Sequence, residues 1–302
     1  MGMGSLKIVH TADLHLGTAY EGMGTEKRRE RIKDFFSNLD RIVDFSIRED
    51  ADFLLISGDI FSSSLPRGEI FNAFAERIGK LVSSGVKVVA IAGNHDTPPS
   101  YHQRNTSLAL RLAGVKDFHY VDYRAEPKSF VLKGEKSGKK VAFLAVPFIH
   151  PSALSKEGID EYVLEVLTRE VEGSYDYRIG LAHFTIEGSK YSEINEPAFT
   201  YEMKVSKSAI QQALEIGDLD YLALGHIHLH QHVVRGKAVY PGSIERVTMG
   251  EVEQKGFVVL EEERSRLTPR FVPLPARKVV RLEGEEFDLT RSRDLLRAVE
   301  GV

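Results

Sequence analysis

Two almost continuously apolar runs limit what this chain can fold into. Residues 86–92 and 140–147 have the length of β-strands, and nearly every side chain in them is aliphatic or aromatic. Strands of this composition are buried on both faces, as in the centre of a sheet that helices cover. Further strands are expected at residues 6–10, 52–57, 177–183 and 220–225.

Helix-patterned stretches lie between the early strands. Residues 26–48 and 69–82 carry apolar side chains at the three- and four-residue spacing of an amphipathic helix. Strands that alternate with helices predict an α/β fold, which we expect to be a layered sandwich. After residue 225 the pattern changes to short pieces at 232–234, 238–240 and 256–261, which predict an antiparallel edge.

The C-terminal part differs in composition from the rest. It contains Pro269, Pro273 and Pro275, and then a charged segment with a helix-like stretch at 291–300. A chain of 302 residues is long enough for one large domain and a small appendage. We therefore expect a main domain at 6–260 and a second, partial module at 261–302.

Composition excludes several classes of protein and of site. The chain has no cysteine, so disulfides, thiolate metal sites and cysteine nucleophiles are excluded. Its net charge of −4 provides no global attraction for a polyanion, so a nucleic-acid substrate would need local basic patches. No secretory leader pattern or membrane-spanning run is visible, and we expect a cytoplasmic, nucleoid-associated protein without membrane contact.

Polar side chains with metal-binding chemistry follow five of the predicted strands. The motifs are Asp13-Leu14-His15, Gly58-Asp59, Gly93-Asn94-His95-Asp96, Ala182-His183 and Gly225-His226-Ile227-His228. An ordinary turn or a single buried histidine explains each motif about equally well by itself. Together they are hard to explain as accidents, because the chain has only eleven histidines and ligand sites form at the carboxyl ends of such strands.

Seven of these residues are candidate metal ligands: Asp13, His15, Asp59, Asn94, His183, His226 and His228. Seven ligands are too many for one ion. Two carboxylates, one amide and four imidazoles suit a pair of Mn, Fe or Zn ions bridged by one carboxylate. Such ions lie about 3.5–4 Å apart and hold the attacking and leaving oxygens of a displacement at phosphorus, with an activated water as nucleophile. The pattern therefore predicts phosphoester hydrolysis.

In order and context, the five motifs resemble those of the calcineurin-like metallophosphoesterase superfamily, whose fold is an α-β-β-α sandwich. Residues 10–17, 58–61, 183–185 and 240–243 further resemble the SbcD-type nucleases of DNA double-strand-break repair, the meiotic recombination eleven family. The resemblance covers roughly residues 6–260. It implies a Mn-dependent DNA nuclease with single-strand endonuclease and 3'–5' exonuclease activity. We expect the exonuclease activity to be reduced, because Ser62 departs from the family pattern.

The resemblance also distributes the ligands over two ions. It places Asp13, His15 and His228 on one ion. It places Asn94, His183 and His226 on the other, with Asp59 as the bridge. The expected cofactors are two Mn ions, with Mg, Fe or Zn as alternatives.

Two further residues match catalytic positions of that family. His95 is implied to contact the scissile phosphate and to protonate the leaving oxygen, and Asp96 is expected to orient His95. The implied partners are DNA, an SMC-like ABC ATPase and a second copy of the chain. The sequence departs from the family at Ser62, because many members carry a histidine three residues after the bridging aspartate. From the part that follows residue 260 we also expect the usual ATPase-docking extension to be missing.

Other interpretations stay open. The chain could act on small nucleotides or phosphoproteins, or serve as a scaffold subunit of an SMC-like ATPase complex. His230 and His232 could extend the metal site, although we expect them beyond it, and His10 is expected to pack behind it. Two surfaces could meet DNA: the stretch 191–203 and the basic cluster of Lys27, Arg28, Arg29, Arg31 and Lys33.

Overall fold

The computed structural model describes residues 4–20, 22–98, 105–124, 128–150, 158–192 and 204–279. One six-stranded sheet contains β1 (Lys7–Thr11), β2 (Phe53–Ser57), β3 (Lys87–Ile91), β4 (Phe118–Val121), β13 (Gly256–Glu263) and β14 (Arg266–Pro273). A second contains β5 (Ser129–Lys133), β6 (Lys140–Val146), β7 (Tyr177–His183), β10 (Tyr221–Gly225), β11 (Gln231–Val234) and β12 (Ala238–Tyr240). The short strands β8 (Thr185–Ile186) and β9 (Lys204–Val205) form a separate pair.

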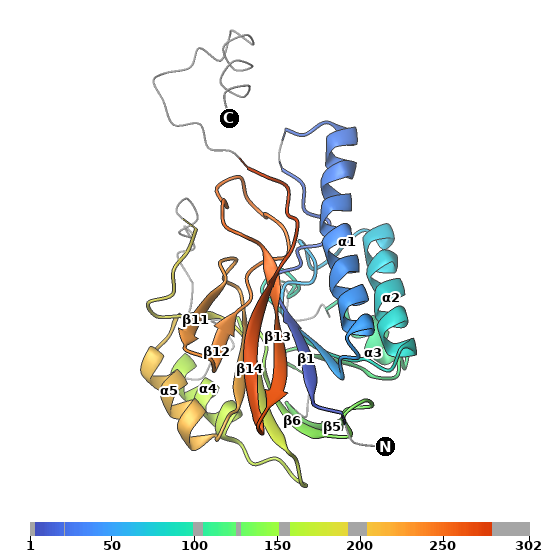
Figure 1. Ribbon diagram of the computed structural model, residues 1–302. Coiled ribbons are helices and arrows are strands. Elements are labelled where there is room, and N and C mark those ends of the chain that lie inside the picture. Colours follow the sequence, from blue (N-terminus) through green and yellow to red (C-terminus); the bar gives the residue numbers. More distant parts are fainter. Residues whose placement is uncertain are drawn as a thin grey trace.

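Helices cover both outer faces of the paired sheets (Figure 1). The helices are α1 (Thr25–Arg48), α2 (Gly68–Ser83), α3 (Leu108–Leu112), α4 (Ile159–Thr168) and α5 (Lys207–Ile216). The strand orders are β14-β13-β1-β2-β3-β4 in the first sheet and β11-β12-β10-β7-β6-β5 in the second. None of the helices in the described ranges is long and apolar enough to cross a membrane.

Alternate side chains of the central strands enter different cores. In β2, Leu54 and Ile56 pack with α1 and α2, whereas Phe53 and Leu55 pack between the two sheets. Successive side chains of a strand point to opposite faces, so one buried strand serves two cores. Strand β10 does the same between the inter-sheet core and the core beneath α4 and α5. The predicted α-β-β-α sandwich is confirmed.

The strongly apolar strands and the two long helices lie where the sequence predicts them, with ends shifted by one or two residues. The elements β4, β5, β8, β9, α3, α4 and α5 were not predicted from the sequence. Helices α4 and α5 have only 10 residues each, and the side chains of β5 are mostly half-buried at the edge of its sheet. Short or edge elements carry a weak periodic signal, which explains these omissions.

The expected domain boundary at residue 260 needs correction. It falls inside β13, which pairs along its whole length with β14 in the first sheet. Pro269 and Pro273 lie in β14, and an edge strand tolerates residues that lack an N–H group. The sheet therefore extends to Pro273. The helix-like stretch 291–300 lies outside the described residues, and a capping module after the sheet stays a proposal.

Candidate metal centre

The candidate ligands come from the ends of strands in both sheets. β1, β2 and β3 are parallel neighbours in the first sheet, and β7 and β10 are parallel neighbours in the second. The two sheets approach closely at these ends, since a Cβ atom at Gly225 would lie only 1.8 Å from the carbonyl oxygen of Ser57. Side chains that follow the strands of both sheets therefore converge on one place.

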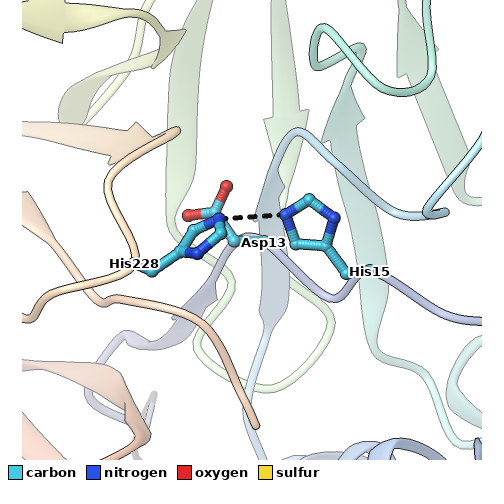
Figure 2. A group of neighbouring side chains, drawn as sticks. All are labelled: Asp13, His15 and His228. Carbon is cyan, nitrogen blue, oxygen red and sulfur yellow. Dashed lines mark hydrogen bonds between the residues drawn. The ribbon is translucent and has the colours of Figure 1, made fainter. Parts of the chain in front are cut away.

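The first group consists of Asp13, His15 and His228 (Figure 2). Their potential ligand atoms all lie within 4.8 Å of one another. Nε2 of His15 is 3.0 Å from Nε2 of His228, so the two rings face each other through their nitrogen atoms. The Asp13 carboxylate is fully buried and accepts the backbone N–H of His226 at 2.9 Å. This hydrogen bond joins the first motif to the last.

The second group surrounds Asn94. Its Oδ1 atom lies 3.0 Å from Nε2 of His183 and 3.0 Å from Nδ1 of His226. Asp59, His183 and His226 also have potential ligand atoms within 4.8 Å of one another. One amide oxygen, two imidazoles and one carboxylate thus meet at a second position.

Asp59 lies between the two groups. Its Oδ2 atom is 3.5 Å from Nε2 of His15 and 3.5 Å from Nε2 of His183. Its Oδ1 atom accepts the backbone N–H of His95 at 2.9 Å. A single carboxylate oxygen equidistant from histidines of both groups has the position required of a bridging ligand.

Hydrogen bonds behind the site fix the tautomers of two histidines. Nδ1 of His183 donates to the carbonyl oxygen of Ser57 at 2.7 Å, and Nδ1 of His228 donates to Oε1 of Glu251 at 2.8 Å. In the neutral ring that binds a metal, a proton on Nδ1 leaves a lone pair on Nε2, which in both residues faces the centre. Histidines that bind metals are commonly held by such outer partners.

The electrostatics of the site favour a cation. Burial raises the pKa of the Asp13 carboxyl, so an ionised carboxylate at this position needs a nearby positive charge. Burial alone would lower the pKa of His183, but the Asp59 carboxylate outweighs it and raises that pKa to about 9. Burial likewise opposes ionisation of Asp59, yet His183 and His15 hold its pKa well below the usual range. The donor set therefore fits divalent cations bound by carboxylate, amide and imidazole groups.

Four of the candidate ligands have a left-handed backbone conformation. The φ angles are 52° at Asp13, 41° at His15, 51° at Asp59 and 99° at His226. Such angles are uncommon outside glycine, cost about 1–3 kcal/mol each and concentrate at functional sites. Asp13 and His15 therefore meet through these bends after β1 has ended.

Two glycines make room for the ligands that follow or face them. A Cβ atom at Gly58, whose φ is +90°, would lie 2.2 Å from Nδ1 of His183. A Cβ atom at Gly93 would lie 2.1 Å from Oδ1 of Asp59. The glycines of these motifs are therefore required by close approach between segments that are distant in the sequence.

His95 and Asp96 occupy different environments. His95 is exposed, and its ring centroid lies 4.8 Å from that of His15. Asp96 is buried, and its carboxylate accepts the backbone N–H groups of Ile60, Phe61 and Gly93 at 3.0–3.1 Å. Burial, followed by the Asp59 charge, raises its pKa to about 6.

Within the described ranges no hydrogen bond joins Asp96 to His95, and the expected orienting role of Asp96 stays a prediction. Its carboxylate turns inward to unpaired backbone donors. It thereby ties the loop after β2 to the loop after β3.

Three other histidines, His10, His230 and His232, lie around the centre without entering it. His10 is buried and hydrogen-bonds to the hydroxyl groups of Tyr221 and Ser57, and burial lowers its pKa to about 3. His230 stacks on Phe271 with ring centroids 4.2 Å apart, and Nδ1 of His232 accepts the backbone N–H of Gly236. As expected, His10 packs behind the site and the other two lie beyond it.

The basic cluster is divided by the fold. Arg31 is buried and donates to the carboxylates of Asp34 and Glu245 and to the carbonyl oxygen of Arg246. It is therefore unavailable to DNA, whereas the other four cations are exposed or half-buried on α1. In the stretch 191–203, Tyr191 packs against the core of the second sheet, while Phe199 and Tyr201 lie outside the described residues.

Sequence reasoning missed Glu251 and Lys255, which lie directly behind His228. Both side chains are fully buried and form an ion pair at 2.6 Å. The available signal was weak: a glutamate and a lysine four residues apart, a few residues after the segment 240–243. That spacing usually indicates an exposed helix pair, so burial had to be seen in the structure.

Comparisons with known proteins give a consistent result. The sequence model of the calcineurin-like phosphoesterases matches residues 6–230. The SbcD component of the nuclease SbcCD from Staphylococcus epidermidis is 28% identical over 308 residues, which cover 95% of this chain and 75% of that protein. The DNA double-strand break repair protein Mre11 of Methanopyrus kandleri is 27% identical over 301 residues, which cover 94% of this chain and 61% of that protein.

Among solved structures, the purple acid phosphatase PPD1 of yellow lupin superposes with a TM-score of 0.48 and 14% identity. The superposition covers 85% of this chain and 49% of the phosphatase.

Proposed function

This chain belongs to the calcineurin-like phosphoesterase family and is a metal-dependent phosphoesterase, and we propose that it is a DNA nuclease acting in double-strand-break repair. The observation that carries the metal-dependent chemistry is the position of Asp59 Oδ2, 3.5 Å from a histidine of each ligand group. DNA as the substrate is supported by the SbcD and Mre11 relatives, which align with 95% and 94% of this chain.

We assign the ligands to two cations. Asp13, His15 and His228 would hold one cation, and Asn94, His183 and His226 would hold the other. Asp59 would serve both. When bound, a pair of divalent cations stabilises negative charge at the phosphorus and lowers the pKa of water. Oxygen and nitrogen donors without thiolates suit Mn, Fe or Zn. We propose Mn, the metal that the family resemblance implies, with Mg, Fe or Zn as alternatives.

The chain's own residues supply the remaining functions. His95 stands exposed beside His15, where a ring N–H can donate a proton to the leaving oxygen of the DNA backbone. Asp96 holds the backbone on both sides of the site through its three hydrogen bonds, and thus fixes Asp59 relative to Asn94. His183 and His228 present Nε2 to the cations because their Nδ1 protons are already engaged.

The mode of cleavage depends on Ser62. Its hydroxyl donates to the carbonyl oxygen of Leu16 at 3.3 Å, so this position supplies a local hydrogen bond and no imidazole. We therefore propose single-strand endonuclease activity with a reduced 3'–5' exonuclease activity. We propose an SMC-like ABC ATPase as a partner, which the SbcD and Mre11 relatives support. We also propose a second copy of the chain as a partner and a place at the nucleoid.

A cleavage assay tests this function. Purified protein is incubated with end-labelled linear and with circular single-stranded DNA, with and without Mn, beside the Asp59→Ala variant. Cutting of the circle that needs both Mn and Asp59 is the expected result. If the protein hydrolyses nucleotide esters far faster than it hydrolyses DNA, it is a small-molecule phosphoesterase and the proposed nuclease function is wrong. If it hydrolyses neither substrate, the result favours a scaffold subunit of an SMC-like ATPase complex.

A further inference from the structure

A buried ion pair lies directly behind one of the candidate ligands. Oε2 of Glu251 is 2.6 Å from Nζ of Lys255, and both side chains are 0% exposed. Taking two charges out of water is costly, and such a pair often contributes little to stability compared with apolar side chains of similar size. A contribution to stability is therefore a weak explanation for a buried ion pair beside His228.

The pair holds His228 at two points. Oε1 of Glu251 accepts the Nδ1 proton of the ring at 2.8 Å. Nζ of Lys255 donates to the backbone carbonyl oxygen of His228 at 3.0 Å. The ring and the backbone of the same residue are thus both fixed. The opposite ring atom, Nε2, is the one that lies 3.0 Å from His15 in the centre.

The carboxylate itself is held firmly. Oε2 of Glu251 accepts the backbone N–H of Val247 at 3.1 Å, and Oε1 accepts that of Thr248 at 3.3 Å. The guanidinium group of Arg246 donates to the backbone carbonyl oxygen of Glu251 at 2.7 Å. Donors from the surrounding loop therefore define where the negative charge lies, and with it the orientation of the imidazole.

The histidines of the two ligand groups differ in the partner that accepts their Nδ1 proton. His228 donates from Nδ1 to a charged carboxylate, whereas His183 donates from Nδ1 to an uncharged carbonyl oxygen, that of Ser57. A carboxylate partner makes an imidazole a better electron donor to a metal than a neutral partner does.

We propose that Glu251 and Lys255 are positioning residues for the cation held by Asp13, His15 and His228. Glu251 fixes the tautomer of His228 and strengthens Nε2 as a ligand, and Lys255 balances the Glu251 charge and anchors the His228 backbone. The inference rests on the proposed metal centre. It predicts that the pair governs one cation and leaves the other largely unaffected.

The test uses Glu251→Gln and the double variant Glu251→Gln/Lys255→Met. In the single variant Lys255 keeps an unbalanced buried charge, so both stability and metal binding should fall. The double variant removes both charges, and its thermal stability should return towards that of the unmodified protein. Mn titration calorimetry should still show one of the two binding events weakened about 10–100-fold. Weakened Mn binding in a variant of restored thermal stability would show that the pair positions the ligand and does not merely stabilise the fold.

Two further measurements identify the affected ligand. Nitrogen NMR of the metal-free protein should show His228 protonated on Nδ1, and should show a mixture of tautomers in the double variant. Adding Glu251→Gln/Lys255→Met to His228→Ala should cost no further Mn affinity, because the ligand that the pair positions is already gone. Val259→Ala, a core change in β13 that removes buried methyl groups, controls for general destabilisation.

The outcomes are distinct. If the unmodified protein binds two Mn ions and the double variant binds both with unchanged affinity, the positioning role is wrong and the metal centre stands. The role is also wrong if both ions weaken equally, or if Val259→Ala weakens binding as much as the double variant does. If the unmodified protein binds no divalent cation, both the proposed centre and this inference fail.

Discussion

A Cβ atom at Gly93 would lie 2.1 Å from Oδ1 of Asp59, so the third motif contacts the Asp59 carboxylate through its backbone. This relationship explains why a residue without a side chain stands before Asn94. It also shows that the motifs are parts of one packed site.

Gly93→Ala is therefore expected to displace Asp59 and to weaken Mn binding. Forced overpacking of this kind typically costs about 1–3 kcal/mol of stability. Titration calorimetry and thermal unfolding provide the measurements. Gly79→Ala, in helix α2 with nothing within 4 Å of the added atom, is the matched control and should stabilise the fold by about 0.5–1 kcal/mol. Equal Mn affinity in the two variants would contradict the contact.

Asp59→Ala should remove both cations, because the carboxylate stands between the two ligand groups. Elemental analysis after dialysis against Mn measures how much metal the variant retains. DNA hydrolysis should fall by more than the roughly 10–100-fold that is typical when a residue hydrogen-bonded to a metal ligand is replaced. Asp218→Ala is the control, since Asp218 is exposed and also has a positive φ, of 46°. Retention of one tightly bound ion in Asp59→Ala would argue against the bridge.

His95→Ala should keep both cations and lose turnover. General acid catalysis contributes about 10²–10⁴-fold, and the loss should appear in kcat at saturating Mn. His232→Ala controls for removal of a histidine beyond the centre. Full activity in His95→Ala would refute the acid role, and loss of an ion would make His95 a ligand.

Ser62→His tests the mode of cleavage. An imidazole at this position should raise exonuclease activity on end-labelled DNA relative to cutting of circular single strands. Ser63→His places the same side chain one residue further along, at an exposed position, and should leave that ratio unchanged. If both variants behave like the unmodified protein, the histidine of the related nucleases does not explain end-directed action.

Glu262 tests whether the segment after residue 260 belongs to the main sheet. Its carboxylate accepts the Leu6 N–H at 2.9 Å and the Tyr177 hydroxyl at 2.7 Å. Burial alone would raise its pKa, but these hydrogen bonds and Lys139 hold that pKa below the usual 4.5.

A lowered pKa stabilises the fold fully above the unfolded value and loses this effect as the pH falls through the folded value. Glu262→Gln should therefore lower the unfolding free energy by about 1.5–3 kcal/mol near neutral pH, the size of a hydrogen bond to a charged group. The difference from the unmodified protein should shrink as the pH falls below 4.5. Urea unfolding at several pH values measures it, with exposed Glu263→Gln as control. A difference independent of pH would contradict the assignment.

The sequence by itself determined the layers and the candidate ligands. Buried strands such as β3 and β6 are recognisable because burial on both faces demands continuous apolar side chains. Polar residues that follow such strands must emerge at one edge of a sheet, and for this reason the sequence predicts Asp59 and Asn94 as candidate ligands.

Only the tertiary structure decided how these residues are held. Asp96 points to backbone donors of the loop after β2, 35 and 36 residues away in sequence, so its neighbours in the sequence gave no indication of its role. Glu251 matters to the site because it hydrogen-bonds to His228, 23 residues away. Strand β14 accommodates Pro269 because it lies at the edge of its sheet. Local patterns follow from the periodicity of strands and helices. Partnerships across the fold depend on which distant segments come together, and this is decided by the packing of the whole chain.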